Sequence, residues 1–350
     1  MAPPSLCNCL LFILLLCLLS PRSLVTALSA TSPSPQTTNR HTLLTFDVDG
    51  TLVHGTGQAA AASVHARAFG HALATLFNNG KAVTPVAEAL PRRLYQGSTD
   101  GLILLRYAKA TLRLAPAVVY KQLPALMECM YEYVSQHSDE DITEHMKVLP
   151  GVLDHLQTLA SLSSTATNNV HCGLVTGNVE GIARRKMHAT GIWQTGALSA
   201  ACVTQKTWPG TEQIQFLGGF GSDYCSGNID DLERNHLDRA SQIEICAQRC
   251  QNLLQCNTKA QKALLTRVVH VGDAPADVLA AKAYRNQQVS KDDNMCVGMV
   301  AVATGSYPAN ELRKLAGEAI PGYWEPVILE NGMADPKFLE ACGIHVKTLR

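Results

Sequence analysis

The chain has 350 residues, of which 46% are hydrophobic and 17% charged, and its 29 lysines and arginines balance its 29 aspartates and glutamates. A chain of this length and composition forms one large globular domain or two moderate ones. Its balanced charge excludes the broadly basic surface that binding to a phosphate backbone needs, so we expect no nucleic acid among its partners.

Residues 1–30 have the composition of a secretory signal peptide. They contain the apolar run LLFILLLCLL, Leu10–Leu19, which is shorter than the about 20 residues that span a bilayer and is followed by Pro21 and small residues. We therefore expect a secreted or luminal protein whose mature chain has no stable membrane span. An uncleaved anchor stays open, because no lysine or arginine precedes the run.

Residues 31–42 are rich in serine, threonine and proline, and no acidic residue precedes Asp47. This composition fits either a linker or an organellar transit segment. A transit segment behind a signal peptide would direct the protein to a plastid by a bipartite signal.

From residue 43 onward, apolar strand patterns alternate with helical patterns. The predicted strands are 43–46, CGLVTG at 172–177, RVVHVG at 267–272 and GMVAVATG at 298–305. The predicted helices are 65–77, 86–95, 99–113, 116–135, 152–162 and 238–256. This alternation predicts an α/β fold with a Rossmann-like, doubly wound parallel sheet that carries helices on both faces.

The stretch 55–147 contains only helical patterns, so we predict an all-helical cap domain inserted after the first strand. The α/β core then consists of residues 43–54 and 148–350, and Pro150 and Gly151 mark the return of the chain to it.

The stretch TFDVDGTLV, 45–53, places Asp47 and Asp49 two residues apart at the end of an apolar run, directly before Gly50. Because Asp is a poor strand former and Gly50 frees the backbone, the strand ends here and both carboxylates can turn towards one small volume. Two anions so close repel each other unless a cation or a proton lies between them, which indicates a metal site or acid–base chemistry.

Further polar residues follow two other predicted strands. Thr176 opens a helix with Gly177 and Asn178, so its hydroxyl and the free backbone N–H groups form an anion site. Asp273 directly follows another strand, and Asp277 lies near the start of the next helix. Because ligands of parallel sheets bind beyond the carboxyl ends of the strands, we expect these residues to meet the acidic pair.

Lys186 lies on the helix that Thr176 opens, where it can add a full positive charge. Each of these residues also has an ordinary interpretation. An Asp after a strand usually stabilises a turn, Thr176 can cap its helix, and Lys186 can be a solvated charge like Arg184 and Arg185. Four such elements in order along a predicted parallel sheet favour the functional interpretation.

In these motifs the sequence resembles the haloacid dehalogenase (HAD)-like hydrolase superfamily, and within it the phosphoglycolate-phosphatase-like branch with a helical cap. The four motifs of that superfamily are matched in order by DVDGT at 47–51, VT at 175–176, Lys186 within IARRKMHATGI, and GDAPAD at 272–277. The resemblance extends from about Leu43 to Asp335.

The resemblance implies a magnesium-dependent phosphatase that hydrolyses a small phosphate monoester of a phosphorylated metabolite. Asp47 would attack phosphorus to give an aspartyl-phosphate, and Asp49 would act as general acid and base. The Asp47 carboxylate, the Asp49 backbone carbonyl and Asp273 would bind Mg²⁺, with Asp277 supporting the metal shell.

The same resemblance assigns the phosphate-binding residues. Thr176 and Lys186 would bind the non-bridging phosphate oxygens, at the anion site that includes Gly177 and Asn178.

Specificity would come from the cap, whose loop GSTDG at 97–101 resembles the loop that faces the active site in this branch. The candidate substrate contacts are Arg93, Thr99 and Asp100. A helix-capping role for Thr99 fits the sequence equally well.

Two features depart from the branch. His54 stands where many relatives carry an acid, and YCSGNIDDLERNHL, 224–237, forms an extra loop to which the sequence assigns no role. The substrate and the oligomeric state therefore stay open, and so do two other functions. One is a phosphomutase of the same superfamily, and the other is a non-catalytic phosphate-binding protein, which the presence of Asp47 and Asp49 disfavours.

Overall fold

A computed structural model describes most of the chain from residue 39 onward. The described residues are 39–55, 63–91, 94, 97–163, 169–198, 217–231, 235–257, 263–290 and 295–345. The predicted signal peptide, most of the predicted linker and Arg93 lie outside these ranges.

A six-stranded sheet in the order β5-β4-β1-β6-β7-β8 forms the centre of the fold, and every neighbouring pair of strands is parallel. Its strands are β1 (Asn39–Phe46), β4 (Val170–Thr176), β5 (Gly218–Phe220), β6 (Ala263–Gly272), β7 (Cys296–Val302) and β8 (Trp324–Leu329). The four strands predicted from the sequence are the four central ones, and the α/β class is confirmed.

Both edge strands are absent from the sequence prediction for a local reason. β5 has only three residues, GGF, and β8 contains Pro326, which a strand tolerates at the edge of a sheet because no ladder hydrogen bond is lost there. β1 begins at Asn39 rather than at residue 43, inside the predicted linker. Its register shifts between His41 and Thr42, and its first residues are polar, so they give no apolar pattern.

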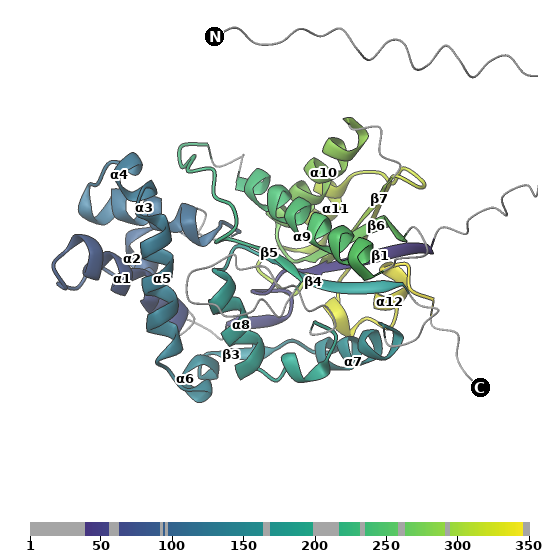
Figure 1. The fold of residues 1–350 in the computed structure, drawn as a ribbon, viewed down its shortest axis with the longest axis horizontal. Helices are drawn as coiled ribbons and strands as arrows, with labels where there is room; N and C mark the ends of the chain where they lie inside the picture. Colours follow the sequence, from purple (N-terminus) through teal and green to yellow (C-terminus); the bar gives the residue numbers. More distant parts are fainter. Residues whose placement is uncertain are drawn as a thin grey trace, which may run out of the picture. The chain divides into compact units, whose positions relative to one another are not determined.

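Helices cover both faces of this sheet (Figure 1). On one face are α9 (Asn235–Asn257), α10 (Pro275–Ser290) and α11 (Ala309–Ala316), and on the other are α7 (Val152–Ser163), α8 (Glu180–Ala189) and α12 (Phe338–Ala341). Side chains of β1 alternate between the two faces, since Leu43 packs in the first core and Leu44 in the second. Short 3₁₀ turns at Trp193–Thr195 and Gly332–Ala334 complete the connections.

Among the described residues, six α-helices lie between the short strands β2 (Val53–Gly55) and β3 (Met146–Val148), and we call them the helical group. They are α1 (Val64–Phe77), α2 (Val86–Ala89), α3 (Asp100–Leu112), α4 (Pro116–Tyr120), α5 (Leu123–Ser135) and α6 (Asp139–Thr143). β2 and β3 pair antiparallel, so the two chain connections to the helical group run side by side.

Two predicted helices in this group are wrong in extent, and proline is the reason in both. The helix predicted over 86–95 ends at Ala89, because Pro91 forces Leu90 into an extended conformation. The helix predicted over 116–135 is divided into α4 and α5, and Pro124 lies in the first turn of the second, where its missing N–H costs nothing.

The helical group has its own apolar core, which extends onto the sheet domain through Val179 and Ile182 of the α8 segment. Gly181 of α8 lies against the ring of Tyr131 on α5, so closely that a side chain there would collide with it. The helical group therefore packs directly on α8. Within the described ranges, no helix is long and apolar enough to cross a membrane.

Candidate functional site

The two acidic side chains of the turn after β1 point in different directions. Asp47 still follows the sheet, since its N–H donates to Val271 O at 2.9 Å, and Gly50 then reverses the chain with a φ of 95°. The bonds Leu52 N–H to Val48 O, 2.9 Å, and Gly50 N–H to Val53 O, 2.7 Å, close the turn. A non-glycine residue rarely adopts this φ, and a Cβ at position 50 would lie 2.3 Å from an oxygen of Asp273.

Three carboxylates meet behind this turn, at the carboxyl edge of the sheet. Asp47 follows β1, Asp273 follows β6, and Asp277 lies in the first turn of α10. Each has a carboxylate oxygen within 4.8 Å of the other two, and all three residues are buried. The convergence that the sequence predicted for these three residues is therefore present in the fold.

A buried arginine that the sequence did not indicate also belongs to this cluster. Arg239 lies on α9 and its side chain is 4% exposed. Its Nη1 donates to Asp277 Oδ1 at 2.6 Å and lies 2.7 Å from Asp47 Oδ1, so one guanidinium nitrogen bridges the two acids.

The pKa values of the three acids are shifted in different directions. Burial raises the pKa of Asp47 to about 7, and the negative charges of Asp277 and Asp49 add to this, while Arg239 opposes it. Burial likewise raises the pKa of Asp273, with contributions from the negative charges of Asp277 and Asp47. Burial would raise the pKa of Asp277 too, but Arg239 and His270 more than compensate and lower it to about 2.

Asp49 turns away from this cluster to a second cation. Lys186 Nζ donates to both of its carboxylate oxygens, at 2.8 and 2.7 Å, and to Asn178 Oδ1 at 2.7 Å. Asn178 Nδ2 donates in turn to Asp49 Oδ2 and to Thr176 Oγ1, both at 2.8 Å. Three of the residues predicted to bind phosphate, Thr176, Asn178 and Lys186, thus form one hydrogen-bonded chain that ends on Asp49.

The environment of Asp49 keeps it ionised. Desolvation by the surrounding protein would by itself raise its pKa, but the charges of Lys186 and His65 and the hydrogen bonds from Lys186 and Asn178 lower the pKa to about 2. Lys186 is 4% exposed and uses three donors in these contacts, whereas the side chain of Asp49 is 51% exposed and opens into the adjoining cavity.

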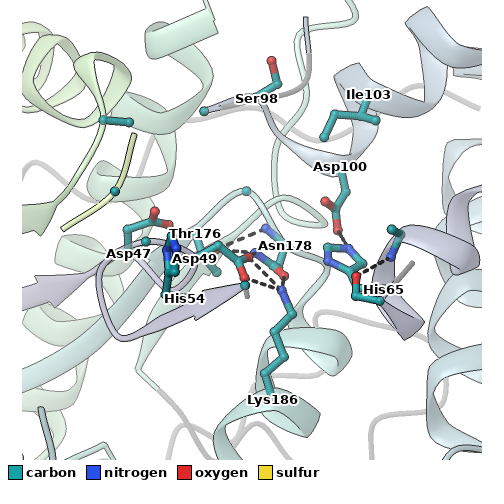
Figure 2. A pocket seen from close by; sticks show the side chains of 18 of the residues that line it. Asp47, Asp49, His54, His65, Ser98, Asp100, Ile103, Thr176, Asn178 and Lys186 are labelled. Atoms are coloured by element: carbon teal, nitrogen blue, oxygen red, sulfur yellow. Dashed lines mark hydrogen bonds and ion pairs between the residues drawn. The ribbon is translucent and has the colours of Figure 1, made fainter. Parts of the chain in front are cut away.

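That cavity, of about 740 Å³, lies between the sheet edge and the helical group (Figure 2). Its lining includes Asp47, Asp49, Thr176, Gly177, Asn178, Lys186, Arg239 and Asp273 from the sheet domain, and His65, Phe69, Val86, Ser98, Asp100 and Ile103 from the helical group. His54 and His145, beside the paired connections, line it as well. A small ligand would contact both parts of the fold.

Two of the predicted specificity residues, Thr99 and Asp100, have structural partners of their own. Thr99 is buried and caps α3, since its Oγ1 accepts from Leu102 N–H at 3.4 Å. The Asp100 carboxylate accepts from Val179 N–H at 2.8 Å and pairs with His65 Nε2 at 3.1 Å, and its own N–H donates to Gly177 O. Asp100 therefore attaches the helical group to the turn before α8 and still borders the cavity, as Figure 2 shows.

The donor set fits a divalent cation. Within the described part of this sheet edge, four carboxylates meet two cationic side chains, Lys186 and Arg239, which leaves an excess of two negative charges when all four acids are ionised. Carboxylate oxygens are the ligands that magnesium prefers. The oxygens of Asp47 and Asp273, which carry raised pKa values, are those that an added positive charge would stabilise most.

Neighbouring side chains hold these acids in place. Thr51 Oγ1 donates to Asp273 Oδ1 at 3.2 Å, and His270 lies 3.3 Å from Asp277 Oδ1 while sharing a hydrogen bond with Thr45.

Comparison of the chain with known protein families, with curated proteins and with solved structures found no match.

Proposed function

We propose that the protein is a magnesium-dependent phosphatase of the HAD-like type, which hydrolyses a small phosphate monoester through an aspartyl-phosphate. One observation carries the proposal. Two acids of a single turn open onto one cavity but lie in opposite environments, Asp47 buried among acids and Arg239, and Asp49 against Lys186. The proposal includes a Rossmann-like core, 43–54 and 148–350, and a cap, 55–147.

In the first step, Asp47 is the nucleophile. A carboxylate oxygen forms a bond to phosphorus while the bond from phosphorus to the leaving oxygen breaks, and Asp49, protonated from solvent once the phosphate is bound, donates its proton to that oxygen. In the second step, Asp49 accepts a proton from water, whose oxygen attacks phosphorus and releases Asp47 and inorganic phosphate. Both acids end in their starting protonation states.

Lys186 must exchange partners in this scheme. Its three N–H groups already donate to Asp49 and Asn178, so it can contact a phosphate oxygen only by giving up part of that bonding. The pKa of Asp49 then rises, because a major cause of its depression is removed. Binding of the phosphate thereby prepares Asp49 to be a proton donor.

Asp47, Asp273 and Asp277 would hold the metal ion, and the backbone carbonyl of Asp49 is the further ligand that the resemblance implies. When bound, the ion supplies positive charge that reduces repulsion between the nucleophile and the phosphate. Arg239 supplies such charge from the protein itself, and we assign it to the phosphate-binding group together with Lys186, Thr176 and Asn178.

A screen of phosphate esters tests this function. The purified protein is assayed with two-carbon, sugar and nucleotide phosphates, with magnesium and with chelator, and release of inorganic phosphate is measured. We expect metal-dependent turnover that Asp47→Asn eliminates. Turnover in chelator, or an unimpaired Asp47→Asn protein, contradicts the proposal, and isomerisation of a sugar phosphate without release of phosphate indicates a mutase.

A further inference from the structure

The segment 224–231, to which the sequence assigned no role, lies along the helical group, and we call it the strap. Tyr120 of α4 donates from its hydroxyl to Cys225 O at 3.1 Å, and Lys109 of α3 pairs with Asp230 at 3.2 Å. Ile229 is buried in the core of the helical group. Gly101 of α3 allows the strap to lie close, since a Cβ there would come within 2.8 Å of Cys225 Sγ.

Arg106 of α3 joins the strap, the helical group and α9. It is 4% exposed. Its Nη1 donates to Leu94 O and to Ser98 Oγ, both at 2.9 Å, its Nε to Ile229 O at 3.4 Å, and its Nη2 to Asn235 Oδ1 at 2.7 Å. Asn235 Nδ2 donates back to Ser98 Oγ at 3.2 Å, which closes a ring of contacts.

The first turn of α9 connects this ring to the candidate active site. Asn235 and Arg239 are four residues apart in α9, so they lie one above the other on one face of the helix. Asp238 also fixes the strap to this turn, because its Oδ2 accepts from Ser226 N–H at 3.0 Å. The same helical turn therefore holds the helical group at one residue and Asp47 at another.

We infer that Arg106 is a positioning residue for the reaction. Through Asn235 and the first turn of α9 it holds Arg239 against Asp47, so the placement of the helical group and the placement of the site cation are coupled. The inference rests on the proposed function for its catalytic consequence, but the coupling itself is a property of the fold. A cap that moved freely on its two connections would need no such bond.

The test compares two substitutions on the same helix in the full chain. Arg106→Met removes the ring, and Lys109→Met removes the exposed pair to the same strap, so it serves as the control. Hydrogen–deuterium exchange is followed in residues 224–231 and 235–239. We expect faster exchange in both segments for Arg106→Met and no change at 235–239 for Lys109→Met; unchanged exchange at 235–239 in Arg106→Met overturns the coupling.

Kinetics then separate positioning from simple support of the fold. We expect kcat to fall about tenfold in Arg106→Met with little change in KM, since a small misplacement of a catalytic group is costly. In the double variant, Arg106→Met should lower kcat no further than Arg239→Met does alone. Independent, multiplying losses contradict the inference.

Two further outcomes are distinguished by the same design. If Arg106→Met does not fold, Asn235→Leu leaves Arg106 in place but removes the Nη2 acceptor and the bond to Ser98 Oγ. It should give the same exchange and the same loss of kcat, while normal values for it overturn the inference. If the native protein has no phosphatase activity, the proposed function fails, and hydrogen exchange still decides whether the coupling exists.

Discussion

Asp47 and Asp49 show how two identical side chains on one turn acquire different chemistry from their neighbours. Asp47 lies in a cluster that is short of positive charge, and Asp49 faces a lysine with three donors. The sequence could indicate both acids, because they follow an apolar run directly. It could not indicate Arg239, which reaches Asp47 only because α9 packs on the sheet, a contact between segments almost 200 residues apart.

Metal binding should depend on pH through the acidic cluster. Protons compete with the ion at Asp47, whose pKa is raised to about 7, and at Asp273, whose pKa is raised as well. Calorimetry should show magnesium affinity about tenfold weaker at about pH 6 than at about pH 8, with proton release on binding. Asp47→Asn should flatten this dependence, and equal affinities at both pH values in the native protein would contradict the assignment.

Arg239 should contribute to turnover through its charge. Arg239→Met is expected to lower kcat about 100-fold, the usual effect of losing one donor to a developing charge, and Arg239→Lys should recover part of the rate. Arg313→Met is the matched control. It removes an exposed ion pair with Glu330 and should leave kcat unchanged. Equal rates for Arg239→Met and the control would remove Arg239 from the site.

At the level of single elements, the four central strands and the centres of several helices were predictable, whereas several ends were not. The period of apolar residues gave α1, α3 and α7 within two residues. Pro91 and Pro124 ended or divided helices whose apolar pattern continued past them. The contact between α3 and the turn before α8 was not predictable either, because Asp100 looks like an ordinary helix-start acid.

The contact between α3 and the turn before α8 should make position 177 intolerant of a side chain. A Cβ at Gly177 would lie 2.6 Å from Ser98 O, so Gly177→Ala should push the start of α3 away and weaken the bond from Asp100 N–H to Gly177 O. We expect a loss of about 1–3 kcal/mol in the free energy of unfolding, together with a raised KM. Gly70→Ala, whose Cβ would meet only Tyr107 at 3.4 Å, should be neutral or stabilising in denaturant unfolding. Equal losses for both would argue against the contact.

A pair of histidines on the neighbouring strands β1 and β4 should make the protein less stable in mild acid. His41 Nδ1 lies 3.0 Å from His171 Nε2, and burial together with the charge of His41 lowers the pKa of His171 to about 4. Between about 4 and the unfolded value of 6.5 the unfolded chain binds more protons, so stability is lost as the pH falls through this window.

Denaturant unfolding measures this loss. We expect the free energy of unfolding to drop by about 1–2 kcal/mol between about pH 7 and about pH 5, and His171→Asn should reduce the drop. The same pH dependence in the variant would show that other groups are responsible.

For the whole molecule, the sequence predicted a parallel sheet with helices on both faces but could not give its edges or the way the helical group is held. β5 and β8 are recognised as strands only through pairing with β4 and β7. The helical group is attached at the β2–β3 ribbon, at Asp100 and along the strap, and the last two attachments join residues distant in the chain. This arrangement places the cavity between two parts whose relative position the fold controls.

Covalent catalysis by Asp47 can be tested by the capture of its phosphorylated form. The protein is mixed with a chromogenic aryl phosphate and magnesium, quenched in acid, reduced with borohydride and analysed by peptide mass spectrometry. We predict that residue 47 is converted to homoserine, and that chelator or Asp47→Asn abolishes the product. Release of phosphate with no modification at residue 47, or with modification at another residue, would show that Asp47 is not the nucleophile.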